Sequence, residues 1–352
     1  MLYWQGHERK KRKTTTDLTI LTFPSVRLAI LSDIHYASTA EEARGEDYEY
    51  RYLPNPFLRL IVRIYRRYYW LRYPLRQNYL LDRFLEQAVA LRPDYVIANG
   101  DFAVNTAFLG LSDDAAFQSA SECLDKLRTK FGPSFRATYG DHELGKLSFF
   151  GGHGGMRIES WRRARENLGM EPFWRLSLGN YLLVGVVSSL LALPVYISET
   201  LPEEREEWQR LRAAHLAEIR QAFSGLRPEQ RVLLFCHDPT ALPFLWQEDC
   251  IRQKLSQFEQ TIIGHLHSTL VLRQSRILAG IPRIGFLGNT ARRLSTALRQ
   301  AKDWQPFKVR LCPSLAGIEL LKDGGFYIAD VDPNAEKPVD FQFQSIPRDE
   351  HK

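Results

Sequence analysis

Short apolar runs alternate along this chain with longer stretches in which apolar residues recur at helical spacing. Runs rich in branched and aromatic residues predict buried strands, whereas a spacing of three to four residues predicts amphipathic helices. The expected strands cover residues 26–32, 95–98, 135–139, 173–177, 181–188, 231–236 and 260–263. The expected helices cover residues 77–91, 114–130, 157–168, 202–223 and 289–302. This alternation favours an α/β core.

Acidic and histidine residues stand at the ends of five of these strands, where open α/β sheets place their ligands. The five motifs are Asp33-Ile34-His35, Gly100-Asp101, Gly140-Asp141-His142-Glu143, His237 and Gly264-His265-Leu266-His267. Each motif alone is a weak signal, because an isolated Gly-Asp is usually a turn and an isolated Asp-x-His is usually incidental. Carboxylate and imidazole groups are ligands for divalent metals. All five motifs in this order predict a site for two divalent ions.

The ordered motifs resemble those of the calcineurin-like metallophosphoesterase superfamily, whose pattern is Asp-x-His, Gly-Asp, Gly-Asn-His-Asp/Glu, His and Gly-His-x-His. Here they span residues 33–267. The resemblance implies a four-layer αββα sandwich, in which two mixed β-sheets are flanked by helices, with the dimetal site at one edge. The strands after residue 268 are expected to complete the second sheet. The resemblance also implies hydrolysis of a phosphodiester or pyrophosphate bond, in which a hydroxide held by the metals attacks phosphorus.

Carried over residue by residue, the resemblance implies two metal ions that share one carboxylate. One ion would be held by Asp33, His35, Asp101 and His267, and the other by Asp101, Asp141, His237 and His265. His142 would stabilise the transition state or protonate the leaving oxygen, and Glu143 would orient it. Mn²⁺ is the expected metal, and Fe and Zn²⁺ also suit this mixture of ligands.

The third motif departs from the family pattern, which has Asn at the position of Asp141. With Asp33 and Asp101, this residue brings three negative charges against four positive charges from two divalent ions. The metal centre of this chain would therefore have a net charge of +1, whereas a centre with Asn at position 141 would have +2. We therefore expect a weaker attraction for phosphate, a more firmly held second metal and an altered metal preference.

Residues 37–78 are expected to form an inserted cap, because they separate the first motif from the next helix by more than a usual loop. Residues 56–74 have apolar side chains on one side of a predicted helix and Arg59, Arg63, Arg66 and Arg67 on the other. A basic amphipathic helix with aromatic residues is typical of a membrane-surface helix. The alternative is a helix that packs on the protein's own core and leaves its arginines in solvent. We expect these arginines, and His153 in a glycine-rich segment, to contact substrate phosphate.

A basic, apolar cap beside a dimetal site resembles the UDP-2,3-diacylglucosamine pyrophosphate hydrolases of lipid A synthesis. That resemblance implies a membrane-associated lipid substrate and the release of UMP and a lipid phosphate. The alternatives are a soluble phosphodiesterase or phosphatase acting on nucleotides or phosphoproteins, a nuclease, and a non-enzymatic scaffold. Nucleic acid is disfavoured because the arginines lie on an apolar helix and the sequence shows no nucleic-acid-binding module. The scaffold is disfavoured because the ligand set is intact.

Composition adds few constraints. The 352 residues are 44% hydrophobic and 25% charged, which is usual for a soluble globular protein, and the net charge of +6 favours an anionic partner. Four scattered cysteines predict reduced thiols, and no apolar run suits a signal peptide or a spanning helix. We therefore expect a cytoplasmic protein, with peripheral contact to the inner face of the membrane through residues 56–74. Residues 1–25 are predicted to be a basic extension of a single domain, residues 26–345.

Overall fold

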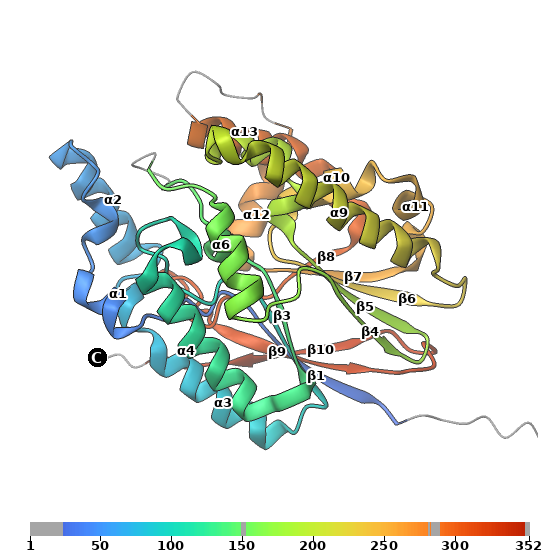
Figure 1. The fold of residues 1–352 in the computed structure, drawn as a ribbon. Coiled ribbons are helices and arrows are strands. Elements are labelled where there is room, and N and C mark those ends of the chain that lie inside the picture. The colour runs from blue at the N-terminus through green and yellow to red at the C-terminus, as the bar shows by residue number, and fades with distance from the viewer. Residues whose placement is uncertain (1–23, 149–152, 281, 283–288, 349–352) are drawn as a thin grey trace, which may run out of the picture.

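The structure is a computed structural model that describes residues 24–148, 153–280, 282 and 289–348. Two five-stranded β-sheets pack face to face, and helices cover the outer face of each sheet (Figure 1). Leu28 and Ile97 from one sheet, with Leu233 and Ile262 from the other, are fully buried in one apolar cluster between them. The predicted four-layer αββα sandwich is therefore confirmed. The predicted basic extension lies outside the described residues apart from residues 24 and 25.

The first sheet has the strand order β10-β9-β1-β2-β3. Its strands are β1 (Val26–Leu31), β2 (Tyr95–Asn99), β3 (Phe135–Thr138), β9 (Gly325–Val331) and β10 (Asp340–Ser345). β1, β2 and β3 are parallel, whereas β9 pairs antiparallel with β1 and β10 pairs antiparallel with β9. The helices α3 (Asn78–Leu91) and α4 (Asp114–Phe131) cover its outer face (Figure 1). Asp113 is the N-cap of α4 and accepts a hydrogen bond from Ala116 N.

The second sheet has the strand order β4-β5-β6-β7-β8. Its strands are β4 (Trp174–Leu178), β5 (Tyr181–Val186), β6 (Arg231–Cys236), β7 (Phe258–Ile263) and β8 (Val309–Leu311). β4 is antiparallel to β5, and the other strands are parallel. The expectation that all strands after residue 268 complete this sheet is wrong for β9 and β10. They extend the first sheet, because β9 pairs with the free edge of β1 from Val26 opposite Val331 to Ile30 opposite Tyr327.

The remaining helices include several short ones that the sequence did not predict. They are α1 (Thr39–Arg44), α2 (Pro56–Tyr68), α5 (Asp141–Leu144), α6 (Ile158–Arg162), α7 (Ser188–Leu191), α8 (Leu193–Tyr196), α9 (Arg205–Ser224), α10 (Leu242–Trp246), α11 (Asp249–Arg252), α12 (Thr269–Ile277) and α13 (Asn289–Gln300). A π-helical turn, Arg163–Asn167, extends α6. None of the described helices has both the length and the hydropathy needed to cross a bilayer. All four cysteines are free, as expected.

Residues 37–78, the predicted cap, contain α1 and α2, and α2 projects from the body of the molecule (Figure 1). Asn55 caps α2 by accepting hydrogen bonds from the backbone N–H groups of Phe57 and Leu58. Of the α2 side chains, only Val62 is buried, in a small cluster with Tyr50 and Leu53. The structure therefore does not have the alternative arrangement, in which the apolar side of this helix packs on the protein's own core.

Three of the four arginines of α2, rather than its apolar residues, make its polar contacts with the preceding segment. Arg63 pairs with Asp47, and Arg66 lies 2.8 Å from the carboxylate of Glu49. Arg59 donates to the carbonyl oxygen of Leu53 at 2.7 Å. These contacts orient α2 so that its apolar face points to solvent, with Phe57 67% and Ile64 50% exposed.

Candidate metal centre

The five motifs all lie where strands end, and the two sheets bring them to one edge of the sandwich. Asp33 and His35 follow β1, Asp101 follows β2, and Asp141 begins α5 just after β3. His237 follows β6, and the pair His265 and His267 follows β7. All seven predicted ligands are buried or partly buried. The structure therefore gathers every residue that the sequence proposed as a metal ligand.

An unusual backbone conformation directs these side chains into the site. Asp33, His35, Asp101, His265 and His267 all have φ between +51° and +61°. This left-handed region costs a residue with a Cβ atom roughly 1 kcal/mol. Such strained positions cluster at functional sites, where the surrounding structure holds them in place. In each Asp-x-His or His-x-His motif, two left-handed residues bring both side chains to the same side of the strand end.

The first cluster consists of Asp33, His35 and His267, whose potential ligand atoms all lie within 4.8 Å of one another. The Nε2 atoms of the two histidines are 3.0 Å apart, and His267 Nε2 lies 3.4 Å from Asp33 Oδ1. Burial, and then the neighbouring His142, lower the pKa of His35 to about 3. A neutral imidazole is the form that binds a metal.

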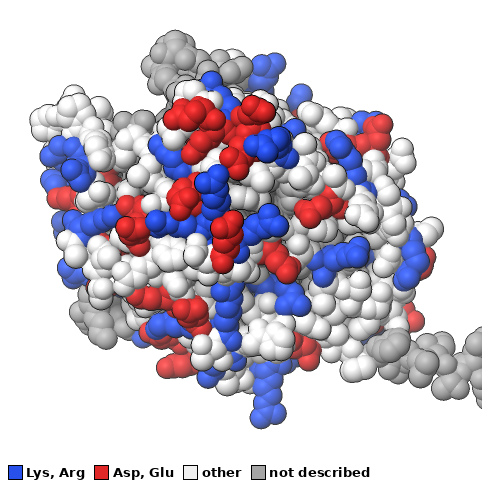
Figure 2. All heavy atoms as spheres, in the orientation of Figure 1, with Lys and Arg blue, Asp and Glu red and all other residues white. Residues whose placement is uncertain are grey.

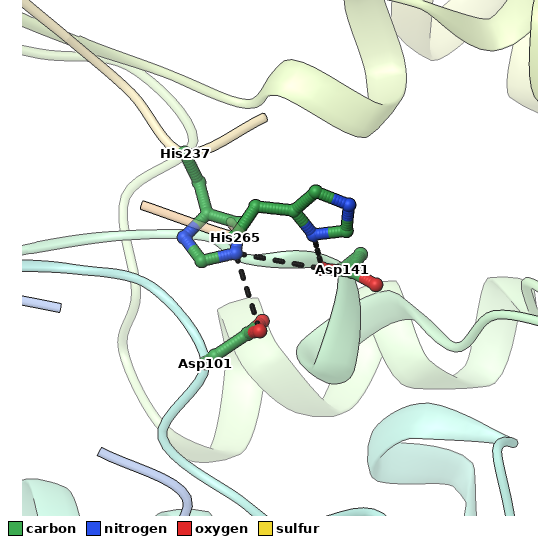
Figure 3. Close-up of side chains that lie close together, drawn as sticks. All are labelled: Asp101, Asp141, His237 and His265. Atoms are coloured by element: carbon green, nitrogen blue, oxygen red, sulfur yellow. Dashed lines mark hydrogen bonds and ion pairs between the residues drawn. The ribbon is translucent and has the colours of Figure 1, made fainter. Parts of the chain in front are cut away.

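The second cluster consists of Asp101, Asp141, His237 and His265 (Figure 3). His237 Nε2 lies 3.2 Å from Asp101 Oδ2 and 3.4 Å from Asp141 Oδ1. His265 Nδ1 lies 2.9 Å from the same Asp141 oxygen. Asp101 also groups with His35 and His142, so this carboxylate lies between the two clusters. That is the position of a bridging ligand.

The surroundings of His237 indicate whether this set of side chains suits a cation. Its Nδ1 lies 2.5 Å from the carbonyl oxygen of Asn99, so Nδ1 donates to that oxygen and Nε2 faces the site. The buried Nε2 atom faces two carboxylates and has no hydrogen-bond partner among the described residues. Burial opposes a charge on His237, but Asp101 and Asp33 raise its pKa well above the usual value. The carboxylates thus require a positive charge here, which a divalent cation supplies.

Two such cations would be held by the two clusters through the shared carboxylate of Asp101. When bound, they supply Lewis-acid stabilisation of phosphate charge and lower the pKa of water. The mixed oxygen and nitrogen donors suit Mn²⁺, Fe and Zn²⁺.

Glu143 has a different role from the one expected. Its carboxylate accepts backbone hydrogen bonds from Asp101 at 3.0 Å, Phe102 at 2.8 Å and Gly140 at 2.7 Å. It therefore links the loop that follows β2 to the loop that follows β3, and both loops carry predicted ligands. His142 is oriented instead by the carbonyl oxygen of Ala103, 2.9 Å from its Nδ1, which leaves Nε2 facing Asp101 at 3.7 Å. The expectation that Glu143 orients His142 is corrected accordingly.

One residue of the site was missed by the sequence reasoning. The Nζ atom of Lys146 lies 3.1 Å from Asp141 Oδ2 and forms a hydrogen bond with His142 Nε2. Its only sequence signal is its position four residues after His142, where one helical turn would bring the two side chains together.

The residues expected to bind substrate phosphate lie outside the two clusters. Arg59, Arg63 and Arg66 make the cap contacts described above, and the guanidinium of Arg67 lies 5.7 Å from the ring centre of Tyr68. His153 packs against Tyr52 and Phe108, with ring centres 4.2 and 5.1 Å away. Residues 149–152 of the glycine-rich segment lie outside the described residues. Contact between these five side chains and substrate stays a prediction.

Close packing at Gly264 makes the site sensitive to a single methyl group. A Cβ atom there would overlap Ser32 Oγ and lie 2.6 Å from Asp33 Oδ2 and 2.9 Å from His237 Nδ1. We expect Gly264→Ala to lower the free energy of unfolding by about 1–3 kcal/mol and to reduce the metal content. Thermal unfolding and elemental analysis measure both. Gly225→Ala is the control, because its new Cβ would meet nothing closer than 3.7 Å. Wild-type metal content in Gly264→Ala would contradict the packing argument.

A comparison with models of protein families identifies the family of this chain. The profile of the calcineurin-like phosphoesterase family matches residues 26–269. No curated protein matches the chain. A dimetal phosphatase from Danio rerio is 15% identical, with a TM-score of 0.49, and the match covers 92% of this chain and 97% of that one. A predicted phosphoesterase from Streptococcus pneumoniae is 10% identical, with a TM-score of 0.25, and the match covers 92% and 99%. Since the family profile spans more than half of the sequence and includes every ligand motif, the chain belongs to the calcineurin-like phosphoesterases and is a metal-dependent phosphoric ester hydrolase.

Proposed function

We propose that this enzyme hydrolyses a phosphodiester or pyrophosphate bond in a lipid-linked substrate, which it reaches at an anionic membrane surface. UDP-2,3-diacylglucosamine is the specific candidate. The observation that supports the proposal is the solvent-facing apolar side of α2, which adjoins the metal centre. A soluble phosphodiesterase or phosphatase acting on nucleotides or phosphoproteins is the alternative.

The apolar side of α2 forms an exposed strip. Its exposed residues are Phe57, Leu58, Leu60, Ile61, Ile64, Tyr65 and Tyr68. Leu320 and Leu321, 54% and 48% exposed, extend the strip, because Leu320 N donates to the carbonyl oxygen of Tyr69. A contiguous apolar surface of this kind is typical of an interaction site.

The strip leads to the first metal cluster. Trp70, just beyond the end of α2, packs its ring on His267 with the ring centres 4.4 Å apart. The carbonyl oxygen of Trp70 accepts a hydrogen bond from Glu319 N at 2.6 Å, and Tyr69 Oη donates to Gln274 Oε1 at 3.0 Å. These bonds anchor the helix beside the site. Thirteen helical residues span about 20 Å, so an acyl chain lying on α2 would place an attached phosphate near the metals.

Basic groups accompany the apolar strip. A cavity of about 170 Å³ beneath α2 is lined by Glu46, Asp47, Tyr50, Arg63, Arg66, Arg67, Arg72 and Tyr73. Arg67 and Arg72 have no carboxylate partner among the described residues and lie beside tyrosine rings. Figure 2 shows basic and uncharged side chains side by side in the region of α2. Apolar residues flanked by arginines suit a bilayer that contains anionic lipids.

The test replaces three exposed residues together, in the variant Leu58→Gln/Ile61→Gln/Ile64→Gln. Glutamine keeps helix propensity and removes apolar surface. We expect binding to vesicles of 3:1 phosphatidylcholine and phosphatidylglycerol to fall at least about tenfold, measured by co-sedimentation. Hydrolysis of a lipid pyrophosphate in mixed micelles should fall similarly, while a soluble aryl phosphodiester is cleaved as before.

Val89→Gln, on an exposed residue of α3, is the matched control, and circular dichroism and the melting temperature verify folding. If wild-type protein does not sediment with the vesicles, or if the triple variant sediments equally well, the membrane proposal is wrong. Activity confined to soluble esters would favour the alternative.

A further inference from the structure

We propose that Lys146 and Asp141 together do the work of the asparagine that the family has at position 141. The Lys146 ammonium group supplies the hydrogen-bond donor that the asparagine amide would provide. Its positive charge also offsets the negative charge of the Asp141 carboxylate. The proposal rests on the metal-dependent phosphoesterase function and is independent of the lipid substrate. It makes Lys146 a positioning residue of the metal centre.

The two carboxylate oxygens of Asp141 have different partners. Oδ1 faces the second cluster, 2.9 Å from His265 Nδ1 and 3.4 Å from His237 Nε2 (Figure 3). Oδ2 lies 3.1 Å from Lys146 Nζ. Asparagine would place an amide nitrogen, a donor, at one of these two positions. A carboxylate oxygen can only accept, so a buried Asp141 requires a donor beside it, and Lys146 provides one.

The backbone holds Lys146 in place. It follows Gly145, whose φ of +96° ends the short helix α5, and its N–H donates to the carbonyl oxygen of Phe108 at 3.1 Å. The side chain is 21% exposed and extends back to Asp141 and His142. The ammonium group therefore lies between a predicted metal ligand and the predicted acid.

The pair changes the charge balance expected from the sequence. Asp33, Asp101 and Asp141 with two divalent ions leave a net charge of +1, and Lys146 raises it to +2. That equals the charge of a centre with asparagine at position 141 and no lysine. Because both partners are largely shielded from solvent, their interaction is stronger than that of a surface ion pair. The expected weakening of phosphate attraction is therefore offset in this chain.

A double-mutant cycle tests the pair, using Lys146→Met, Asp141→Asn and the double variant. Lys146→Met loaded with Mn²⁺ has a net charge of +1 at its metal centre and should bind inorganic phosphate about tenfold more weakly than wild type. Asp141→Asn has a net charge of +3 at the centre and should bind the second Mn²⁺ about tenfold more weakly than wild type. The double variant has the wild-type net charge of +2. Its dissociation constants for phosphate and for the second Mn²⁺ should therefore lie within about threefold of the wild-type values. Isothermal titration calorimetry measures both constants, without reference to turnover.

Two further variants complete the design. Lys146→Arg keeps the charge and should retain phosphate affinity, whereas Lys126→Met removes the charge of a surface pair with Asp82 and should change neither constant. Melting temperatures verify that each variant folds. If either binding constant of the double variant stays as weak as in the corresponding single variant, Lys146 does not compensate the charge of Asp141 and the proposal is overturned. Absence of wild-type hydrolysis of an aryl phosphate with Mn²⁺ would instead contradict the phosphoesterase function and leave the binding cycle interpretable.

Discussion

Asp101→Asn is expected to lower kcat/KM by about 10³-fold or more, the largest effect of any single substitution in this site. The Asp101 carboxylate lies 3.2 Å from His237 Nε2 and 3.7 Å from His142 Nε2, and it belongs to groups on both sides of the centre. An amide has one oxygen and no charge, so it cannot bridge two cations. Steady-state hydrolysis of an aryl phosphodiester and elemental analysis give the two readouts, and the metal content should fall from two ions to one or fewer.

Asp82→Asn is the matched control for this substitution. The Asp82 side chain is 54% exposed and pairs with Lys126 on the surface, so its loss should leave turnover and metal content unchanged. Two tightly bound ions in Asp101→Asn would show that this residue is not shared.

His142→Ala should lower kcat by about 10²-fold to 10⁴-fold while the protein keeps two metal ions. Its Nδ1 bonds to the carbonyl oxygen of Ala103, so Nε2 faces the site beside Asp101 and Lys146. A proton on Nε2 would point into the site, where it can be donated to a leaving oxygen or stabilise charge on it, although burial lowers the pKa of His142. Steady-state kinetics and metal analysis of the same preparation provide the measurement.

The metal content of His142→Ala distinguishes a role of His142 in proton transfer from a role as a metal ligand. His142 could also group with His35 and Asp101 around a cation. Loss of one ion in His142→Ala would assign it as a ligand, whereas loss of turnover at full metal content supports the proton-transfer role. Rescue of turnover by added imidazole, with metal content unchanged, would support that role further.

The residues of the metal centre were largely predictable because their signals are local. Each motif at the end of an apolar run is weak alone, but the five in this order predict ligands at strand ends, and all seven predicted ligands meet in the structure. The same local patterns predicted most strands to within a few residues. Lys146 was missed because it lies beyond the motif, and a lysine by itself does not indicate which carboxylate it contacts. Glu143 was assigned the wrong contact, because sequence shows that a carboxylate is present but not which N–H groups surround it.

The sequence by itself therefore determined the set of predicted ligands, the α/β alternation and the amphipathic character of α2, since periodicity and turn chemistry act within a few residues. The αββα class followed from the resemblance to the family. Only the tertiary structure decided that β9 joins the first sheet and that α2 presents its apolar face to solvent. The first depends on which strand edge is left unpaired when the sheets assemble. The second depends on Asp47, Glu49 and the carbonyl group of Leu53, which lie where they can bind the arginines of α2. Choices of this kind rest on contacts between separate segments of the chain, which a local pattern does not contain.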